Sequence, residues 1–208
     1  MRSGSYTKLL DRFYDSPLRI VVYLFVFITL PSATTIGLAT EVLILGLFAL
    51  AFNLVFGFAG LLSFGHALFL GVGAYAAALL TIHLGWPILA ILAVVIVLQI
   101  LLGLVVGGLS LRLSGIYFAI ITLAFAQFFY ELSFTFSSIT GGSDGLIGIF
   151  RPSMFGLDMV TVGSSASYYG FVTAIVTLVV VFVYALSRST FGRTLQAIKE
   201  NEERTEAL

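Results

Sequence analysis

Ser63 and His66 are the side chains whose types and spacing come closest to catalytic chemistry. They lie three residues apart in a stretch of glycine and apolar residues. A serine nucleophile and a histidine base need a third group, an acid that orients the imidazole, and no carboxylate lies near them in sequence. We therefore expect no catalytic residue in this chain, and both side chains are candidates for binding a polar group instead.

Three further polar residues lie in apolar surroundings. Gln127 and Glu131 are four residues apart, which places them on one face of a helix, near its end. They either take part in function, with Glu131 as the deepest carboxylate, or lie at the solvent interface. Asn53 is expected to be buried in an apolar run, where it either lines a functional path or bonds a neighbouring helix.

A scarcity of reactive residues excludes several classes of protein. The chain has no cysteine, so disulfides and thiolate chemistry are absent. Its two histidines, His66 and His83, cannot form a three-ligand zinc site without nearby carboxylates. Neither of its lysines, Lys8 and Lys199, follows a glycine, so there is no phosphate-binding Walker A loop. We expect no metal, no cofactor and no ATP hydrolysis by this chain.

Long apolar segments must position these side chains. Apolar residues make up 60% of the sequence, and the mean hydropathy is +1.12. About 20 helical residues, at roughly 1.5 Å each, cross the hydrocarbon core of a bilayer. We therefore expect an all-α, polytopic integral membrane protein, in which Pro31 kinks or ends the first helix. The six predicted spans are residues 20–38, 42–62, 65–84, 88–109, 116–132 and 169–186.

The positions of the basic residues predict the topology. With the N-terminus in the cytoplasm, six spans place nine of the ten lysines and arginines inside and only Arg151 outside. Both termini are therefore expected in the cytoplasm. The expected parts are a cytoplasmic tail at 1–19, an incomplete transmembrane domain at 20–187 with an extracytoplasmic loop at 133–168, and a cytoplasmic segment at 188–208.

The glycine-rich stretch 57–75 has two interpretations in this topology. Its glycines weaken helix continuity, and irregular backbone at membrane depth persists only where protein or water solvates it. The stretch is either a broken segment that lines a translocation path or a short cytoplasmic turn followed by tight helix packing. The candidate path residues are Asn53, Ser63, His66, Gly71, Gly73, Tyr75, Gln127 and Glu131.

A cytoplasmic helix with one apolar stripe is predicted after the last span. Phe191, Leu195 and Ile198 recur at helical spacing, and charged residues surround them. The glutamates at its end argue against an anionic lipid surface, so a protein partner is expected. Because the charged helical pattern still continues at Leu208, we expect a fragment of a longer protein or a naturally short form.

Several segments, taken in order, resemble the permease of branched-chain amino-acid ABC transporters, the LivM-like group. The resemblance covers residues 50–208, and the first 40 residues contribute little to it. The matching segments are GLLSFGHA at 60–67 with GVGAY at 71–75, LRLSGIYFAI at 111–120, TLAFA at 122–126, TGGSDGL at 140–146 and FGRTLQAIKENE at 191–202. In the family, the last segment continues through a glycine into further spans.

The resemblance implies a permease subunit of an ABC importer in the plasma (inner) membrane of a prokaryote. Its implied partners are a second, related permease, two cytoplasmic ATPases that bind ATP, an extracytoplasmic substrate-binding protein and membrane lipid, but no nucleic acid. The binding-protein side is assigned to Gly141, Gly142, Ser143 and Asp144. The ATPase-coupling residues are Phe191, Gly192, Arg193, Leu195, Ile198, Glu200 and Glu206.

Branched-chain or related hydrophobic amino acids are the expected substrates, moved by alternating access. Urea or a short amide is the alternative within the same family pattern. A passive channel or a proton-coupled secondary transporter is the alternative from another class, and it would be indicated by transport that persists without ATP.

Overall fold

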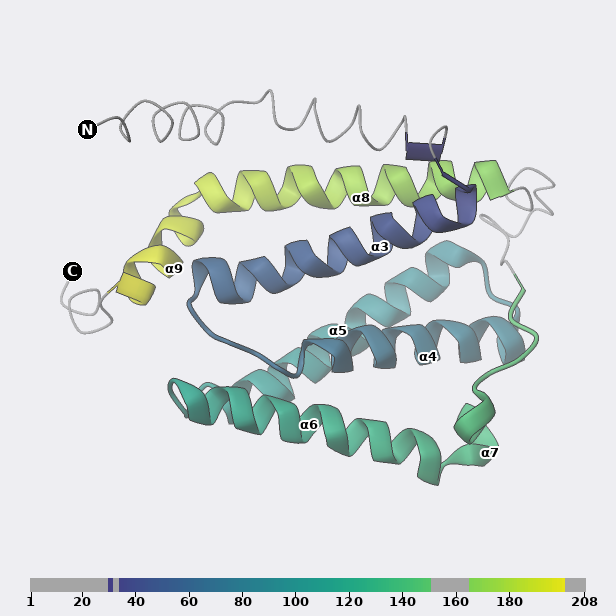
Figure 1. The fold of residues 1–208 in the computed structure, drawn as a ribbon, viewed down its shortest axis with the longest axis horizontal. Helices are drawn as coiled ribbons and strands as arrows, with labels where there is room; N and C mark the ends of the chain where they lie inside the picture. Colours follow the sequence, from purple (N-terminus) through teal and green to yellow (C-terminus); the bar gives the residue numbers. More distant parts are fainter. Residues whose placement is uncertain (1–29, 32–33, 151–164, 201–208) are drawn as a thin grey trace. The chain divides into compact units, whose positions relative to one another are not determined.

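The computed structural model describes residues 30–31, 34–150 and 165–200, and these parts of the chain are predominantly helical (Figure 1). Their elements are α3 (Ile36–Asn53), a π-helical turn η1 (Leu54–Phe58), α4 (His66–Leu84), α5 (Ile88–Ser110), α6 (Ile116–Thr135), α7 (Ser137–Thr140), a 3₁₀ turn η2 (Gly142–Asp144), α8 (Ser165–Arg188) and α9 (Thr190–Glu200).

Five helices in the described ranges are long and apolar enough to cross a membrane: α3 with η1, α4, α5, α6 and α8. In lipid, a helix satisfies its own backbone polar groups, which is why long apolar segments adopt this form. The prediction of an all-α polytopic membrane protein is confirmed.

The boundary between the first two predicted spans is wrong. Thr34 and Thr35 are not helical, and α3 already begins at Ile36, so Leu38 belongs to α3 and not to the end of an earlier span. The Thr35 hydroxyl accepts a hydrogen bond from the Leu38 amide (3.4 Å), as an N-cap residue does. The tail at 1–19 and most of the first predicted span lie outside the described residues.

The predicted ends of three other segments also move. The second span ends at Phe58 instead of 62, because the chain leaves the helix through η1 and an irregular stretch up to Gly65. The loop expected from 133 begins after Thr135 and contains α7 and η2. The last span begins at Ser165 instead of 169. Residues 151–164, with Arg151, lie outside the described ranges.

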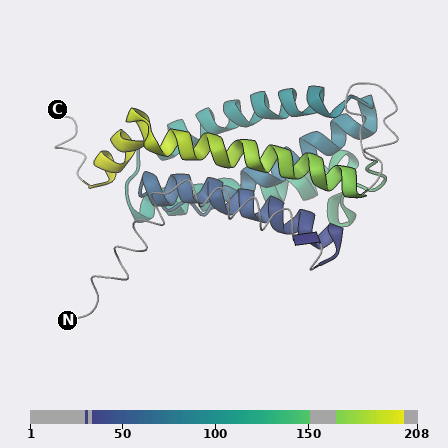
Figure 2. The ribbon, with the colours of Figure 1, turned by 90° about the horizontal axis from the view of Figure 1, so that it is seen from above.

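The described residues belong to two units, the first of which combines α3 up to Leu50 with α8 and the start of α9. Its core contains Ala39 and Leu43 of α3 packed with Tyr169 and Val176 of α8. The two helices run side by side in the same direction, as Figures 1 and 2 show. Parallel spans require an odd number of crossings between them, and α4, α5 and α6 supply three.

The second unit extends from Ala51 through η2 and includes the end of α9. In it, α4 packs against both α5 and α6. The side-chain amide of Gln99 in α5 donates to the Phe69 carbonyl of α4 (2.8 Å). The Thr122 hydroxyl of α6 accepts from the Phe64 amide just before α4 (3.2 Å). These bonds cross between neighbouring helices and hold α4 between its two partners.

Candidate functional site

A cavity of about 370 Å³ lies between α4 and α6. Its volume falls at the lower end of the roughly 300–1,000 Å³ that is typical of small-molecule sites. Three of the predicted path residues, Gly71, Tyr75 and Gln127, line it. The apolar lining residues are Phe64, Ala67, Leu68, Val72, Leu123, Ala126 and Phe129, and the polar ones besides Tyr75 and Gln127 are Tyr130 and Ser133.

The Gln127 side-chain oxygen and the Tyr75 hydroxyl are two polar groups at this cavity that are suited to binding a ligand. The Gln127 side-chain amide donates to a Glu131 carboxylate oxygen (2.8 Å), which confirms that the two residues share a helix face. This bond uses the Gln127 nitrogen and leaves its side-chain oxygen as an acceptor. Neither that oxygen nor the Tyr75 hydroxyl has a hydrogen-bond partner among the described residues. The cavity thus combines apolar walls with a hydroxyl and an acceptor, while Glu131, which is bonded to Gln127, does not itself line it.

Ser63 and His66 border this cavity without lining it. Ser63 is buried, with 7% of its surface exposed, in the irregular stretch before α4. His66 is the first residue of α4, and its ring packs edge-on against Phe52 (centroids 5.7 Å apart) and close to Phe69 (6.2 Å). Aromatic packing therefore holds the imidazole at the junction where the chain turns into α4.

Two other predicted path residues lie elsewhere. Asn53 is exposed at the last residue of α3, so the expectation that it is buried is wrong; its side chain lies against Gly57, where an added Cβ would be 2.5 Å from the Asn53 oxygen. Gly73 faces α5, since a Cβ added there would lie 2.7 Å from the Gln99 amide nitrogen. Gly73 therefore allows α4 and α5 to approach closely.

The turn predicted to face the binding protein is compact. Gly141 has a φ of +79° and ends α7, with its amide bonded to the Ser137 carbonyl (2.9 Å). A Cβ on Gly141 would overlap the Gly145 carbonyl oxygen, so only glycine fits here. The Thr140 hydroxyl donates to the carbonyls of Ser133 and Phe136, while Ser143 and Asp144 remain exposed.

The amphipathic helix expected after the last span is present as α9. Ser189 caps it: its hydroxyl accepts from the Gly192 amide (3.3 Å) and its carbonyl from the Arg193 amide (3.2 Å). Phe191 at 58% and Ile198 at 39% exposure leave the predicted apolar stripe largely uncovered. Leu195 is half-buried, and Arg193 and Glu200 are exposed, whereas Glu206 lies outside the described residues.

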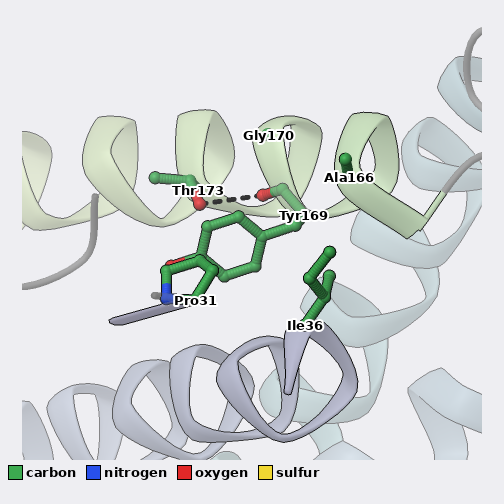
Figure 3. Close-up of a pocket in the computed structure, with 6 residues that line it drawn as sticks. All are labelled: Pro31, Ile36, Ala166, Tyr169, Gly170 and Thr173. Atoms are coloured by element: carbon green, nitrogen blue, oxygen red, sulfur yellow. Dashed lines mark hydrogen bonds between the residues drawn. The ribbon is translucent and has the colours of Figure 1, made fainter. Parts of the chain in front are cut away.

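A second cavity, of about 320 Å³, lies in the first unit between the starts of α3 and α8. Figure 3 shows the Tyr169 ring pointing from α8 toward Pro31 and Ile36. The Thr173 hydroxyl donates to the Tyr169 carbonyl in its own helix (2.8 Å). Because its lining is chiefly apolar and that hydroxyl is already used, this cavity suits a polar ligand less well than the cavity between α4 and α6.

A family model described as "Branched-chain amino acid transport system / permease component" matches residues 34–208. The chain belongs to this family. The match covers every element of the described structure and both sides of the α4–α6 cavity. The resemblance noted in the sequence motifs is confirmed, and the family is one of transport permeases rather than of enzymes.

Two curated relatives are the "High-affinity branched-chain amino acid transport system permease protein LivM" of two bacteria. The Escherichia coli (strain K12) protein is 30% identical over 82% of this chain and 45% of its own length. The Salmonella typhimurium (strain LT2) protein is 35% identical over 61% of this chain and 30% of its own length. The chain thus spans less than half of the length of these relatives, and no solved structure matches it significantly.

Glu41 is a candidate functional residue of this permease-family chain that the sequence pattern concealed. The predicted span boundary places it between two helices, which leaves Glu131 as the deepest carboxylate that the sequence predicts. In the structure, Glu41 lies in α3, five residues after Ile36, or about 8 Å along the helix. Glu131 lies four residues from the end of α6. Reading Thr35 as an N-cap before the apolar run would have revealed Glu41.

We expect the face of α3 that carries Glu41 to contact water rather than lipid, because an ionised carboxylate in hydrocarbon is costly. Since the chain has no cysteine, a single Glu41→Cys change can be probed with a membrane-impermeant thiol reagent. Labelling is expected to be at least about tenfold faster than at Ala93→Cys. Ala93 lies at the same distance from the start of α5, in a groove lined by apolar residues alone. Equal rates at the two positions would contradict the expectation.

Proposed function

We propose that this chain is the permease subunit of an ABC importer that takes up branched-chain or related hydrophobic amino acids. The bacterial relatives are named for high-affinity branched-chain amino-acid transport. A separate ATPase would supply the energy, since the sequence has no Walker A loop, and transport would proceed by alternating access. The observation that carries the proposal is the composition of the cavity between α4 and α6 within this family.

The cavity suits a small zwitterion with an apolar side chain. Its apolar residues would contact the side chain of the substrate. An ammonium group only donates hydrogen bonds, and the Gln127 oxygen, with the Glu131 carboxylate next to Gln127, offers acceptors for it. The Tyr75 hydroxyl can donate to a carboxylate. Urea and short amides have no apolar side chain, so the large apolar share of the lining favours amino acids.

The remaining surfaces would serve the partners. The exposed stripe of α9, with Phe191 and Ile198, would dock on a cytoplasmic ATPase. The exposed Ser143 and Asp144 of the turn after α7 would meet an extracytoplasmic binding protein. A second, related permease would complete the pathway in the inner membrane of a prokaryote. The cytoplasmic location of both termini belongs to this proposal and follows from the charge distribution.

The test is uptake by the complete permease, assembled with its partners in proteoliposomes. We expect ATP-dependent accumulation of leucine, isoleucine and valine, and much slower entry of urea, acetamide and glycine. Accumulation of urea in preference to leucine would refute amino acids as the substrate class and favour urea or short amides. If leucine instead equilibrates across the membrane without ATP, the protein is a passive channel and the proposal of an ABC importer is refuted.

Filling the cavity is expected to reduce uptake strongly. Ala67→Phe adds a ring to the α4 wall, and we expect leucine uptake to fall at least about tenfold, because the added volume competes with the substrate. Ala93→Phe makes the same change on the apolar outer groove of α5 and should leave uptake unaltered. Both residues are exposed in the isolated chain, so the two changes carry a similar folding risk. If the Ala67→Phe variant takes up leucine at the unsubstituted rate, this cavity is not part of the substrate pathway.

A further inference from the structure

Lys199 connects two segments that lie far apart in the sequence. Its ammonium nitrogen donates a hydrogen bond to the Gly57 carbonyl (2.8 Å), across 142 residues. Gly57 lies in the π-helical turn η1, at the end of the helix that begins as α3. The last carbonyls of a helix have no donors within it and carry partial negative charge. A lysine ammonium is therefore well suited to bind one of them.

The aliphatic stem of Lys199 makes a second contact, with Gly60. A Cβ added to Gly60 would lie 2.8 Å from the Lys199 Cγ and 3.3 Å from its Cδ. Gly60 also has a φ of +73°, a conformation that L side chains rarely adopt. The ammonium group and the aliphatic stem of Lys199 therefore both contact the glycine-rich residues 57–60, and this side chain links α9 to them.

The same turn leads directly to the α4–α6 cavity. Phe64, four residues after Gly60, lines the cavity, and its amide donates to the Thr122 hydroxyl of α6 (3.2 Å). The next residue, Gly65, lies so close to Thr122 that an added Cβ would overlap the Thr122 carbonyl oxygen. Residues 59–65 therefore cannot shift without moving a wall of the cavity. π-helical turns, such as the one that precedes them, are frequent at functional sites.

We propose that Lys199 is a positioning residue that transmits the displacement of α9 to residues 59–65 and so to the cavity between α4 and α6. The inference rests on the proposed function, in which α9 docks on an ATPase. It adds the route by which movement of that helix would reach the substrate. The segment that would carry the movement is residues 57–65. It contacts Lys199 of α9 at Gly57 and Gly60, and it contacts α6 at Phe64 and Gly65.

The first test measures coupling in the complete transporter in proteoliposomes. Lys199→Met keeps the aliphatic stem and removes the ammonium group. We expect leucine uptake to fall about tenfold while the ATPase still co-purifies and still hydrolyses ATP near the unsubstituted rate. Lys199→Arg retains a donor and should restore part of the uptake. Loss of ATPase co-purification together with uptake, or no change in either, would overturn the proposal.

The second test does not depend on transport. Ser63→Cys places a thiol in the buried turn segment, and Ser110→Cys places one at the fully buried end of α5. We expect Lys199→Met to speed thiol labelling at position 63 several-fold and to leave position 110 unchanged. Equal effects at both positions, or none at either, would overturn the proposed linkage.

The two measurements separate the two proposals. A faster reaction at position 63 in a protein that shows no ATP-dependent uptake would refute the proposed function and leave the linkage standing. ATP-dependent uptake that Lys199→Met does not alter would refute the linkage and leave the function standing.

Discussion

Replacing Gly65 with alanine is expected to destabilise the packing of α4 against α6 by about 1–3 kcal/mol, the usual cost of an overpacked core position. Gly65 is buried at the N-cap of α4, and an added Cβ would overlap the carbonyl oxygen of Thr122 and lie 3.0 Å from its Cβ. The φ of −85° suits alanine, so the effect is steric alone. Because the obstructing oxygen belongs to the backbone, the two helices must move apart.

The measurement is the thermal inactivation midpoint of the purified protein in detergent, together with leucine uptake. We expect a lower midpoint and a loss of most uptake, because Phe64 and the cavity wall shift with the helix. Gly108→Ala is the matched control, since a Cβ at this exposed glycine of α5 meets no atom within 4 Å. If Gly65→Ala inactivates at the same temperature as Gly108→Ala, the close approach of α4 and α6 at Thr122 is refuted.

Replacing Gly192 with alanine is expected to detach α9 from the end of α8. An added Cβ would lie 2.5 Å from the Leu186 carbonyl oxygen and 2.7 Å from that of Ser187. Gly192 is buried in the first turn of α9, where its amide bonds the Ser189 hydroxyl (3.3 Å). Both oxygens belong to the backbone of α8, so they cannot move aside as the end of a flexible side chain could. The turn between the helices must open, at a cost of about 1–3 kcal/mol.

Limited trypsin digestion reports this change without reference to transport. Cleavage after Arg188 and Arg193, which flank the turn, should accelerate in Gly192→Ala, and the ATPase should co-purify less well. Gly46→Ala in α3 provides the control, because a Cβ there meets no atom within 4 Å. Unchanged digestion with lost ATPase binding would assign Gly192 to the partner interface instead of to the turn.

The membrane class, the number and approximate position of the described spans, and α9 follow from the sequence because they depend on local properties. A bilayer demands a minimum apolar length, which the predicted segments near α4, α5 and α6 satisfy within a few residues. The Gln127–Glu131 pair needed only helical spacing, and its hydrogen bond confirms that spacing. The stripe of α9 is likewise a matter of periodicity within one helix.

Where local signals compete, the sequence placed residues wrongly. Glu41 follows an alanine and a threonine and lies between two apolar runs, so a charge and two small residues resembled a link. In the structure Thr34 and Thr35, just before α3, are not helical, and Glu41 lies inside a helix. The apolar neighbours of Asn53 predict that it is buried, but its side chain is exposed on the helix that α3 and η1 form together.

What each polar residue faces was decided by the tertiary structure alone. The spans are apolar on all sides, so their periodicity cannot indicate which face meets another helix. Gly71 and Gly73 are two residues apart and look equivalent in sequence, yet the first lines the cavity and the second makes room for Gln99 of α5. The bond between Lys199 and Gly57 joins residues separated by 142 positions, a pairing set by how the helices pack and by no pattern within either segment.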